Sequence, residues 1–138
     1  MNITYSSSKN VSVAQFKMLL AASSLGERRP VDDDECLEGM LENSNLIVTA
    51  WHEQQLVGIS RSVTDFYYAC YLSDLAVHGD YQKVGIGKRL QLETRRKLGP
   101  KCKLILLAAP QANGYYENLG FTNNPRCWVL DPDDPLRA

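Results

Sequence analysis

The residues best suited to chemistry in this sequence form a short glycine-containing segment, QKVGIGK, at residues 82–88. It follows an apolar run that ends at Val77 and precedes a helical pattern in which Ile86 and Leu90 share one face. Glycines let a ligand approach the backbone closely, and the unpaired N–H groups at a helix start attract an anion. Lys83 and Lys88 add positive charge here, in a chain of formal net charge −1. The segment therefore predicts a turn that holds a phosphate group.

Two common phosphate-binding loops do not fit this segment. A P-loop requires serine or threonine after its Gly-Lys pair, whereas Arg89 follows Gly87 and Lys88 here. A dinucleotide-binding fingerprint requires a third glycine, and Leu90 occupies that position. A nucleotide triphosphatase and a dinucleotide-binding fold are therefore disfavoured.

The pattern that does fit is Gln-x-x-Gly-x-Gly, at residues 82–87, directly after a predicted strand. It resembles the acetyl-CoA signature of the GNAT superfamily of N-acetyltransferases. Residues 116–121 read Tyr-Glu-x-x-Gly-Phe, which is similar to the second signature of that superfamily. The two patterns stand in the family's order, separated by one predicted helix and one predicted strand. The sequence is identified on these grounds as a member of the superfamily.

The resemblance implies that the chain binds acetyl-CoA around the connection between a strand and a helix. In the family, the end of the strand faces the thioester and the turn holds the pyrophosphate. Carried over to matching positions, the cofactor-binding residues are Leu75, Ala76, Val77, Gln82, Lys83, Val84, Gly85, Ile86, Gly87 and Lys88. Ala109 stands where many relatives have an asparagine that contacts the cofactor, and the nearby Asn113 is the candidate to replace it.

The chemistry implied by the resemblance is direct attack of a primary amine on the thioester of acetyl-CoA. This transfer needs a stabilised oxyanion, a protonated thiolate and an acceptor for the amine proton. Backbone N–H groups at residues 75–77 are expected to meet the first need. The resemblance assigns Tyr116 as the general acid, since a phenol of pKa ~10 can share a proton with a thiol of pKa ~8.5. A purely packing role for the Tyr116 ring is the alternative.

The general base is marked by no signature. Many relatives carry a glutamate on a central strand, but here the strand before the turn offers only Tyr71, Ser73 and Asp74. Asp74 is the candidate base. Alternation from Val77 points its side chain away from the cleft, unless a bulge changes the phase of the strand.

Two classes of function stay open on the sequence alone. The first is an N-acetyltransferase that acts on a small-molecule amine or on a protein or peptide amine. The second is a non-catalytic domain that binds or senses acyl-CoA. The resemblance places the acceptor beside the segment between the first two predicted helices, where no signature identifies it. A homodimer is the default oligomeric state.

The composition favours one soluble globular domain over residues 1–138. The near-zero net charge argues against a general nucleic-acid binder, and no apolar run approaches the roughly 18 residues that span a membrane. Cysteines at positions 36, 70, 102 and 127 form no Cys-x-x-Cys pair, so we expect no metal site. Reduced, scattered cysteines favour a cytoplasmic location.

The elements that position these residues are predicted to form one α/β fold. Strands are expected over residues 2–5, 46–51, 56–63, 66–77, 103–109 and 126–130, and helices over residues 11–24, 32–41, 86–98 and 112–119. The fold class is GNAT-like, a mixed and largely antiparallel sheet of six to seven strands flanked by about four helices. The strand over residues 103–109 should run parallel to that over residues 66–77 and lie centrally. Arg61 is expected at the surface, and residues 131–138 as a loose acidic tail.

Overall fold

The computed structural model of the chain describes residues 1–137 and divides into two compact units, Met1–Leu106 and Leu107–Ala138. The first unit holds a five-stranded sheet with α1, α2 and α3, and the second holds α4. The elements are β1 (Ile3–Ser6), α1 (Val13–Ala21), η1 (Ser24–Arg28), α2 (Asp34–Glu42), β2 (Leu46–His52), β3 (Gln55–Thr64), β4 (Ala69–Val77), η2 (Gly79–Tyr81), α3 (Ile86–Arg96), β5 (Lys103–Ile105), η3 (Pro110–Ala112) and α4 (Asn113–Asn118). The single domain predicted from the sequence stays a prediction, because two compact units can belong to one domain.

The sheet of the first unit has the order β1-β2-β3-β4-β5. Its first three pairs are antiparallel, and β4 pairs with β5 in parallel, as predicted. The mixed, largely antiparallel sheet and the four α-helices are thus confirmed. The predicted six to seven strands are wrong, because the described residues form five.

The two errors in the strand prediction lie at the end of the chain. The run 103–109 forms a strand only over Lys103–Ile105, and this strand lies at the edge of the sheet rather than in its centre. Residues 126–130 form no strand, although their apolar composition suits one. A strand needs a partner for its backbone groups, and here Trp128 is 89% exposed. Residues 131–137 are likewise exposed and contain no helix or strand.

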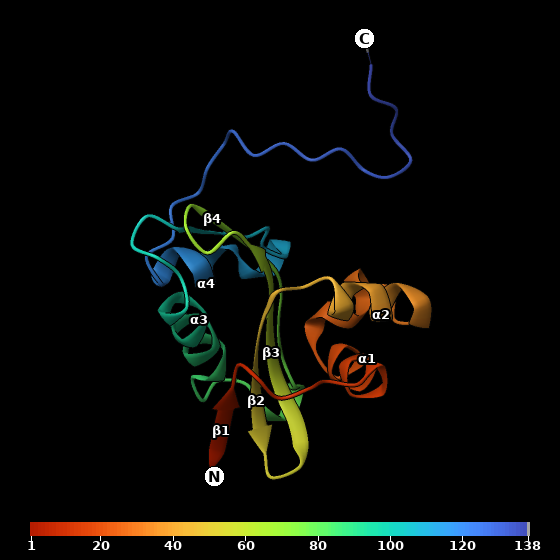
Figure 1. The fold of residues 1–138 in the computed structure, drawn as a ribbon, viewed down its shortest axis with the longest axis vertical. Coiled ribbons are helices and arrows are strands. Elements are labelled where there is room, and N and C mark those ends of the chain that lie inside the picture. Colours follow the sequence, from red (N-terminus) through yellow and green to blue (C-terminus); the bar gives the residue numbers. More distant parts are fainter. Residues whose placement is uncertain (138) are drawn as a thin grey trace. The chain divides into compact units, whose positions relative to one another are not determined.

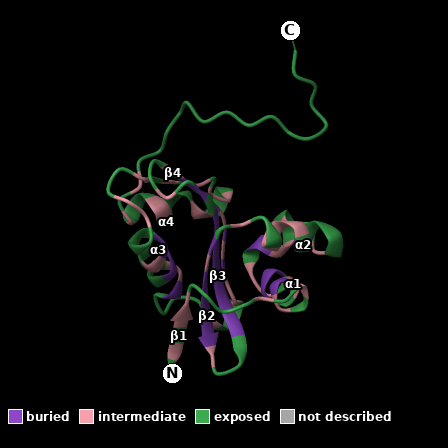
Figure 2. Ribbon diagram, viewed as in Figure 1, coloured by how far each residue is buried: buried purple, intermediate pink, exposed green. Residues whose placement is uncertain are grey.

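Helices α1 and α2 cover one face of the sheet, and α3 covers the other (Figure 1). The buried residues lie along the strands and on the inward faces of these helices (Figure 2). One apolar cluster joins Phe16, Leu19 and Leu20 of α1 to Trp51 and Ile59 of the sheet. A second cluster joins Ile86 and Leu90 of α3 to the opposite face, through Leu46, Val48, Ala50 and Val57. The sheet therefore carries a hydrophobic core on each side.

The first two helices begin where local chemistry satisfies their unpaired amides. Ser12 and Gln15 form a reciprocal capping box at the start of α1. At α2 the Asp33 carboxylate accepts from the Cys36 N–H, and Asp34 stands in the first turn. Negative charge near these amides stabilises the helix start. The acidic residues at the start of α2 thus have a structural role.

The third helix approaches the sheet most closely above Gly58 of β3. A Cβ built there would lie 3.0 Å from Leu90 Cδ1, 3.1 Å from Ile86 Cγ2 and 3.3 Å from Ala50 Cβ. These distances are shorter than ordinary van der Waals contacts, so glycine lets the first turns of α3 rest directly on the strands. The position of the helix start therefore depends on this residue.

Replacement of Gly58 by valine is expected to push α3 away from the sheet. Overpacking of a well-packed core costs about 1–3 kcal/mol of the free energy of unfolding. Urea unfolding followed by circular dichroism should show a lower midpoint with an unchanged slope. Gly39→Ala is the control, since a Cβ there meets nothing within 4 Å in the middle of α2. That change should stabilise the protein by roughly 0.5–1 kcal/mol, and equal effects of the two changes would contradict the close seating of α3.

Candidate cofactor-binding site

The connection from β4 to α3 is a short turn with two left-handed residues. Lys83 has φ 67° and Gly85 has φ 88°. Gly85 is the N-cap of α3, and no side chain caps this helix start. The first intrahelical bond runs from the Arg89 N–H to the Gly85 carbonyl at 3.0 Å. The amides of residues 86–88 therefore point out of the helix start with no acceptor in the helix, which is the arrangement that binds an anion.

Side-chain contacts hold this turn in place on the first unit. The Gln82 amide donates from Nε2 to the Val77 carbonyl at 3.2 Å, so the turn closes back on the end of β4. The Tyr81 hydroxyl lies 2.8 Å from His52 Nδ1 in the β2–β3 hairpin. Ile86 and Leu90 anchor the helix start in the core. The signature glutamine thus orders the loop rather than presenting a free amide.

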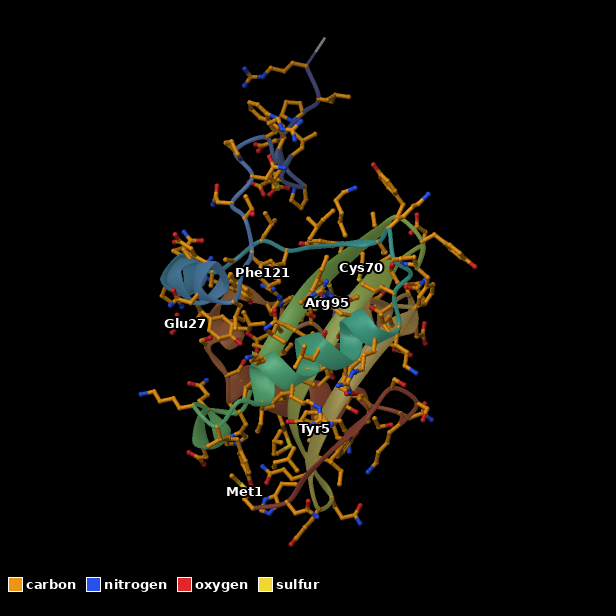
Figure 3. All side chains as sticks on the ribbon, turned by 90° about the vertical axis from the view of Figure 1, so that its left-hand side faces the viewer. Met1, Tyr5, Glu27, Cys70, Arg95 and Phe121 are labelled. Atoms are coloured by element: carbon orange, nitrogen blue, oxygen red, sulfur yellow. The ribbon has the colours of Figure 1, made fainter. Side chains whose placement is uncertain are left out.

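The cationic side chains around the turn differ in their contacts. Lys83 and Lys88 are exposed, and neither ammonium forms an ion pair with the residues that the structure describes. Arg89 turns along the helix instead, with its guanidinium 3.3 Å from Glu93 and 4.8 Å from the centre of the Tyr5 ring. Figure 3 shows Tyr5 beside α3. A Cβ at Gly85 would meet nothing within 4 Å, so the space beside the turn is open to a ligand.

The end of β4 leaves one backbone edge without a strand. Pairing with β5 stops at Tyr71 and Ile105, whereas β4 continues to Val77. Within residues 1–137, no strand pairs with Leu72–Val77 on that side of β4. The predicted residues 75–77 and 82–88 therefore follow one another along the chain, as an open strand edge and, after η2, a turn with free amides. Such a stretch suits an extended ligand that ends in a pyrophosphate.

Asp74 does not have the surroundings of a general base. Its carboxylate is 0% exposed and accepts from Arg29 Nε and Arg61 Nε, each at 2.5 Å. Because the carboxylate is fully buried and each oxygen accepts from a guanidinium group, it offers no free lone pair at the surface to an amine. The side chain of Arg61 is only 8% exposed, so its predicted surface position is wrong. The sequence did not predict that Arg29 and Arg61 pair with Asp74. Its only signal was the position of Arg61, a charged residue inside an apolar strand.

The second signature forms the end of α4 in the second unit. Gly120 has φ 99°, and the Phe121 N–H donates to the Tyr116 carbonyl at 3.1 Å. The Gly120 N–H donates to the Glu117 carbonyl, which completes a Schellman motif. The ring of Phe121 packs edge-on against that of Tyr116, with the ring centres 5.3 Å apart. Tyrosine, glycine and phenylalanine thus occur at this spacing because together they end the helix.

The two predicted side chains of the second unit have different environments. Burial, with a smaller contribution from the neighbouring Tyr115, raises the pKa of Tyr116 to about 12. Asn113 is exposed at the first residue of α4. Because these residues and the turn belong to different units, the approach of Tyr116 and Asn113 to the turn stays a prediction.

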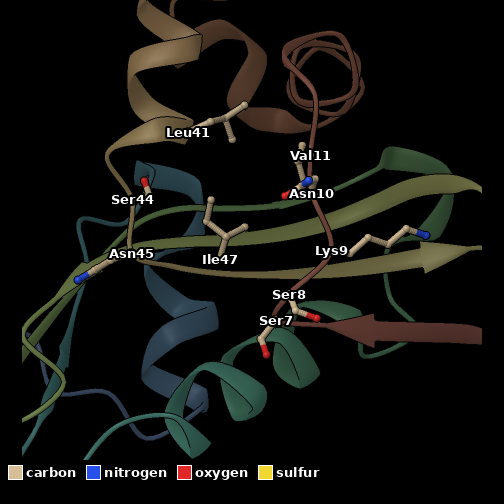
Figure 4. A pocket seen from close by; sticks show the side chains of 9 residues that line it. All are labelled: Ser7, Ser8, Lys9, Asn10, Val11, Leu41, Ser44, Asn45 and Ile47. Atoms are coloured by element: carbon tan, nitrogen blue, oxygen red, sulfur yellow. The ribbon is translucent and has the colours of Figure 1, made fainter.

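A separate recess of about 260 Å³ lies in the first unit between the β1–α1 connection and the end of α2 (Figure 4). Polar side chains dominate its lining, which consists of Ser7, Ser8, Lys9, Asn10, Val11, Leu41, Ser44, Asn45 and Ile47. None of these residues belongs to β4 or to the turn, so the recess is not the predicted cofactor site. Residues 1–137 contain no group of three or more histidine, cysteine or carboxylate side chains that could hold a metal ion. Among the helices of these residues, none is long and apolar enough to cross a membrane.

The α/β fold with an uncapped helix start after its fourth strand is that of an acetyltransferase, as comparison with known proteins shows. The Acetyltransferase (GNAT) domain family matches residues 22–126. The chain therefore belongs to the GNAT acetyltransferase family.

Individual relatives support this assignment. The Uncharacterized N-acetyltransferase ycf52 of Pyropia yezoensis is 28% identical over 131 residues, which cover 90% of this chain and 72% of that protein. Two other curated relatives are matched over only 50% and 57% of their length. A GNAT family acetyltransferase from Streptococcus pneumoniae has a similar fold, with TM-score 0.73, 24% identity and coverage of 94% of this chain and 98% of that one. The aminoglycoside N-acetyltransferase AAC(6')-Iy, solved in complex with CoA, gives TM-score 0.72 at 14% identity, covering 96% of this chain and 95% of that one.

The raised pKa of Tyr116 predicts a distinct titration at high pH. A tyrosine whose pKa is higher in the folded than in the unfolded protein stabilises the fold below the unfolded value, ~10, and loses this contribution as pH rises toward about 12. Absorbance of phenolate at alkaline pH should therefore show a tyrosine that titrates near pH 12 and that Tyr116→Phe removes, whereas Tyr5, whose pKa is also raised by burial, is left in place. Tyr67→Phe, which alters an 80% exposed ring, is the control and should leave the titration near pH 12 in place. If the titration near pH 12 persists in Tyr116→Phe, the burial of this phenol is contradicted.

Proposed function

We propose that this chain is an N-acetyltransferase that moves an acetyl group from acetyl-CoA to a primary amine by direct attack. The uncapped start of α3, directly after the open edge of β4, carries the proposal. Two free lysines add positive charge to a helix terminus that is itself attractive to phosphate. Family membership supplies the reaction class, and the turn supplies a reason why this chain takes a pyrophosphate-containing donor.

In this proposal the donor lies along β4 and over the turn. The amides of residues 86–88 bind the pyrophosphate, with Lys83 and Lys88 beside it. Backbone N–H groups of Leu75–Val77 stabilise the oxyanion that forms when the amine attacks the thioester. Asn113 is proposed to contact the cofactor arm, in place of the asparagine that Ala109 replaces.

Tyr116 is proposed as the group that meets the departing thiolate. With its pKa raised to about 12, the phenol stays protonated throughout the physiological range. Against a thiol of pKa ~8.5, full proton transfer from such a phenol is uphill, so its main contribution is a hydrogen bond to the developing thiolate. Asp74 is assigned no role as a base because both its oxygens bond to arginine. The amine proton leaves to water.

The acceptor is proposed to be a small-molecule amine or an amine of a protein or peptide. The N-acetyltransferase name of the curated relatives and the aminoglycoside substrate named for one protein of similar fold describe those proteins. A cytoplasmic homodimer is the proposed working state of this one. A non-catalytic acyl-CoA sensor is the second candidate, favoured by the absence of an exposed carboxylate base on β4.

Acetyl-CoA should bind through the charges of the turn. Replacement of Lys83 and Lys88 together by methionine is expected to raise the Kd for acetyl-CoA about tenfold, because each exposed contact contributes roughly 0.5–1 kcal/mol. Isothermal titration at two salt concentrations measures the effect, which should shrink at high salt. Lys101→Met, which removes an exposed charge beyond the end of α3, is the control and should leave Kd unchanged. If ATP stabilises the protein against heating and acetyl-CoA does not, the donor assignment is wrong.

Turnover separates the enzyme from the sensor. Thiol release from acetyl-CoA should occur with at least one member of a panel of small and peptide amines. Tyr116→Phe should lower kcat at least tenfold and change the Kd for acetyl-CoA less than twofold, since a lost proton donor acts in the transition state. Tyr115→Phe removes the neighbouring hydroxyl and serves as the matched control. Tight binding of acetyl-CoA with no thiol release across the panel would identify a sensor instead.

A further inference from the structure

The fourth strand contains an extra residue just before the proposed thioester site. Arg61 of β3 pairs with Asp74, but the next residue, Ser62, pairs with Leu72, so Ser73 is left over. The side chains of Ser73 and Asp74 both contact Arg61, whose Nη2 donates to Ser73 Oγ at 2.9 Å. Successive side chains of a regular strand point to opposite faces, so this shared partner marks a β-bulge.

Side chains from three segments meet at this bulge. Arg61 donates from Nη1 to Ser44 Oγ at 2.8 Å, just after the end of α2. Arg29, from the segment between η1 and α2, donates from Nε to Asp74 and from Nη2 to the Ser73 carbonyl at 2.9 Å. The cluster holds two guanidinium groups and one carboxylate, and its carboxylate is fully buried. Such a cluster is stable only when its geometry satisfies every charge.

The two arginines differ in the part of β4 that they bond. Arg61 is a neighbour in the sheet, and it alone compensates the Asp74 charge if Arg29 is removed. Arg29 is 22% exposed and reaches the strand from a connection between helices. It is the one of the two that bonds the backbone of the extra residue. The orientation of the peptide after Ser73 therefore depends on Arg29, and Leu75 follows one residue later.

We propose that Arg29 is a positioning residue for acetyl transfer, which holds the bulge so that the backbone of Leu75–Val77 faces the thioester. The inference rests on the proposed function. Arg29 touches neither donor nor acceptor in this scheme. It acts through Asp74 and the Ser73 carbonyl, and it ties the connection between α1 and α2 to the strand end where the reaction takes place.

The test compares Arg29→Met with Arg28→Met. Arg28 is the exposed neighbour, so both changes remove one positive charge from the same segment. With the amine that releases thiol fastest in the panel, Arg29→Met is expected to lower kcat at least tenfold and leave the Kd for acetyl-CoA within twofold. Arg28→Met should leave both within twofold. Arg29→Lys keeps the positive charge but loses the planar group whose separate nitrogens donate to Asp74 and the Ser73 carbonyl, so it should give an intermediate kcat.

Hydrogen exchange supplies a readout that does not need turnover. Mass spectrometry should show amides of residues 72–77 exchanging at least tenfold faster in Arg29→Met than in the parent or in Arg28→Met, with the rest of the sheet unchanged. Equal kcat and equal exchange in the two variants would overturn the proposal. So would a loss of kcat in Arg29→Met matched by an equal loss of acetyl-CoA affinity and of thermal stability, which is the pattern of a purely structural residue.

The outcome for Arg29 is separable from that for the proposed function. If the parent protein releases no thiol with any amine, the acetyltransferase assignment fails. The exchange comparison then decides alone whether Arg29 orders the end of β4. Faster exchange confined to residues 72–77 upholds that role, and unchanged exchange removes it.

Discussion

The contact between the first turns of α3 and the sheet is the constraint on which the remaining features of the first unit depend. Ile86 and Leu90 are buried against strands that come closest at Gly58. Because the start of the helix cannot shift along the sheet without losing these contacts, its free amides have a fixed position at the end of β4. A site made mainly of backbone groups needs this kind of support, since it has no side chains that could adjust to a ligand.

The buried cluster around Asp74 imposes a second constraint on the same strand. Two arginines and a carboxylate are costly to remove from water, and their cost is recovered only through well-placed hydrogen bonds. Bonds to Ser44, Ser73 and the Ser73 carbonyl supply them. Polar groups thus join the end of α2, the segment after η1 and the bulge of β4, whereas the α3 face of the strand is held by apolar contacts. The strand is fixed from both sides by different interactions.

Local sequence patterns determine some features of this fold, and long-range contacts determine the others. The turn at residues 82–88 and the end of α4 were predictable because glycine at positive φ and helix termination are local properties, seen at Gly85 and Gly120. The pairing of Asp74 with Arg29 and Arg61 was not, because it joins residues 45 and 13 positions apart. The absence of a strand over residues 126–130 was not predictable either, since composition gives strand propensity but does not show whether a partner strand is present. Whether Tyr116 meets the turn depends on long-range placement of the same kind.

After the extra residue, each side chain of β4 is committed to one face of the sheet. Leu75 and Val77 pack with the α3 cluster, and Ala76 packs with the α1 cluster. Deletion of Ser73 alone would remove the bulge and leave these faces unchanged, because Leu72 and Asp74 would then lie at consecutive positions opposite Ser62 and Arg61. Deletion of Leu75 would instead exchange the faces of Ala76 and Val77. Insertions and deletions in homologous chains should therefore be tolerated in the hairpin turns but excluded between Leu75 and Val77, whereas loss of the bulge residue would keep the two cores and remove the carbonyl that Arg29 binds.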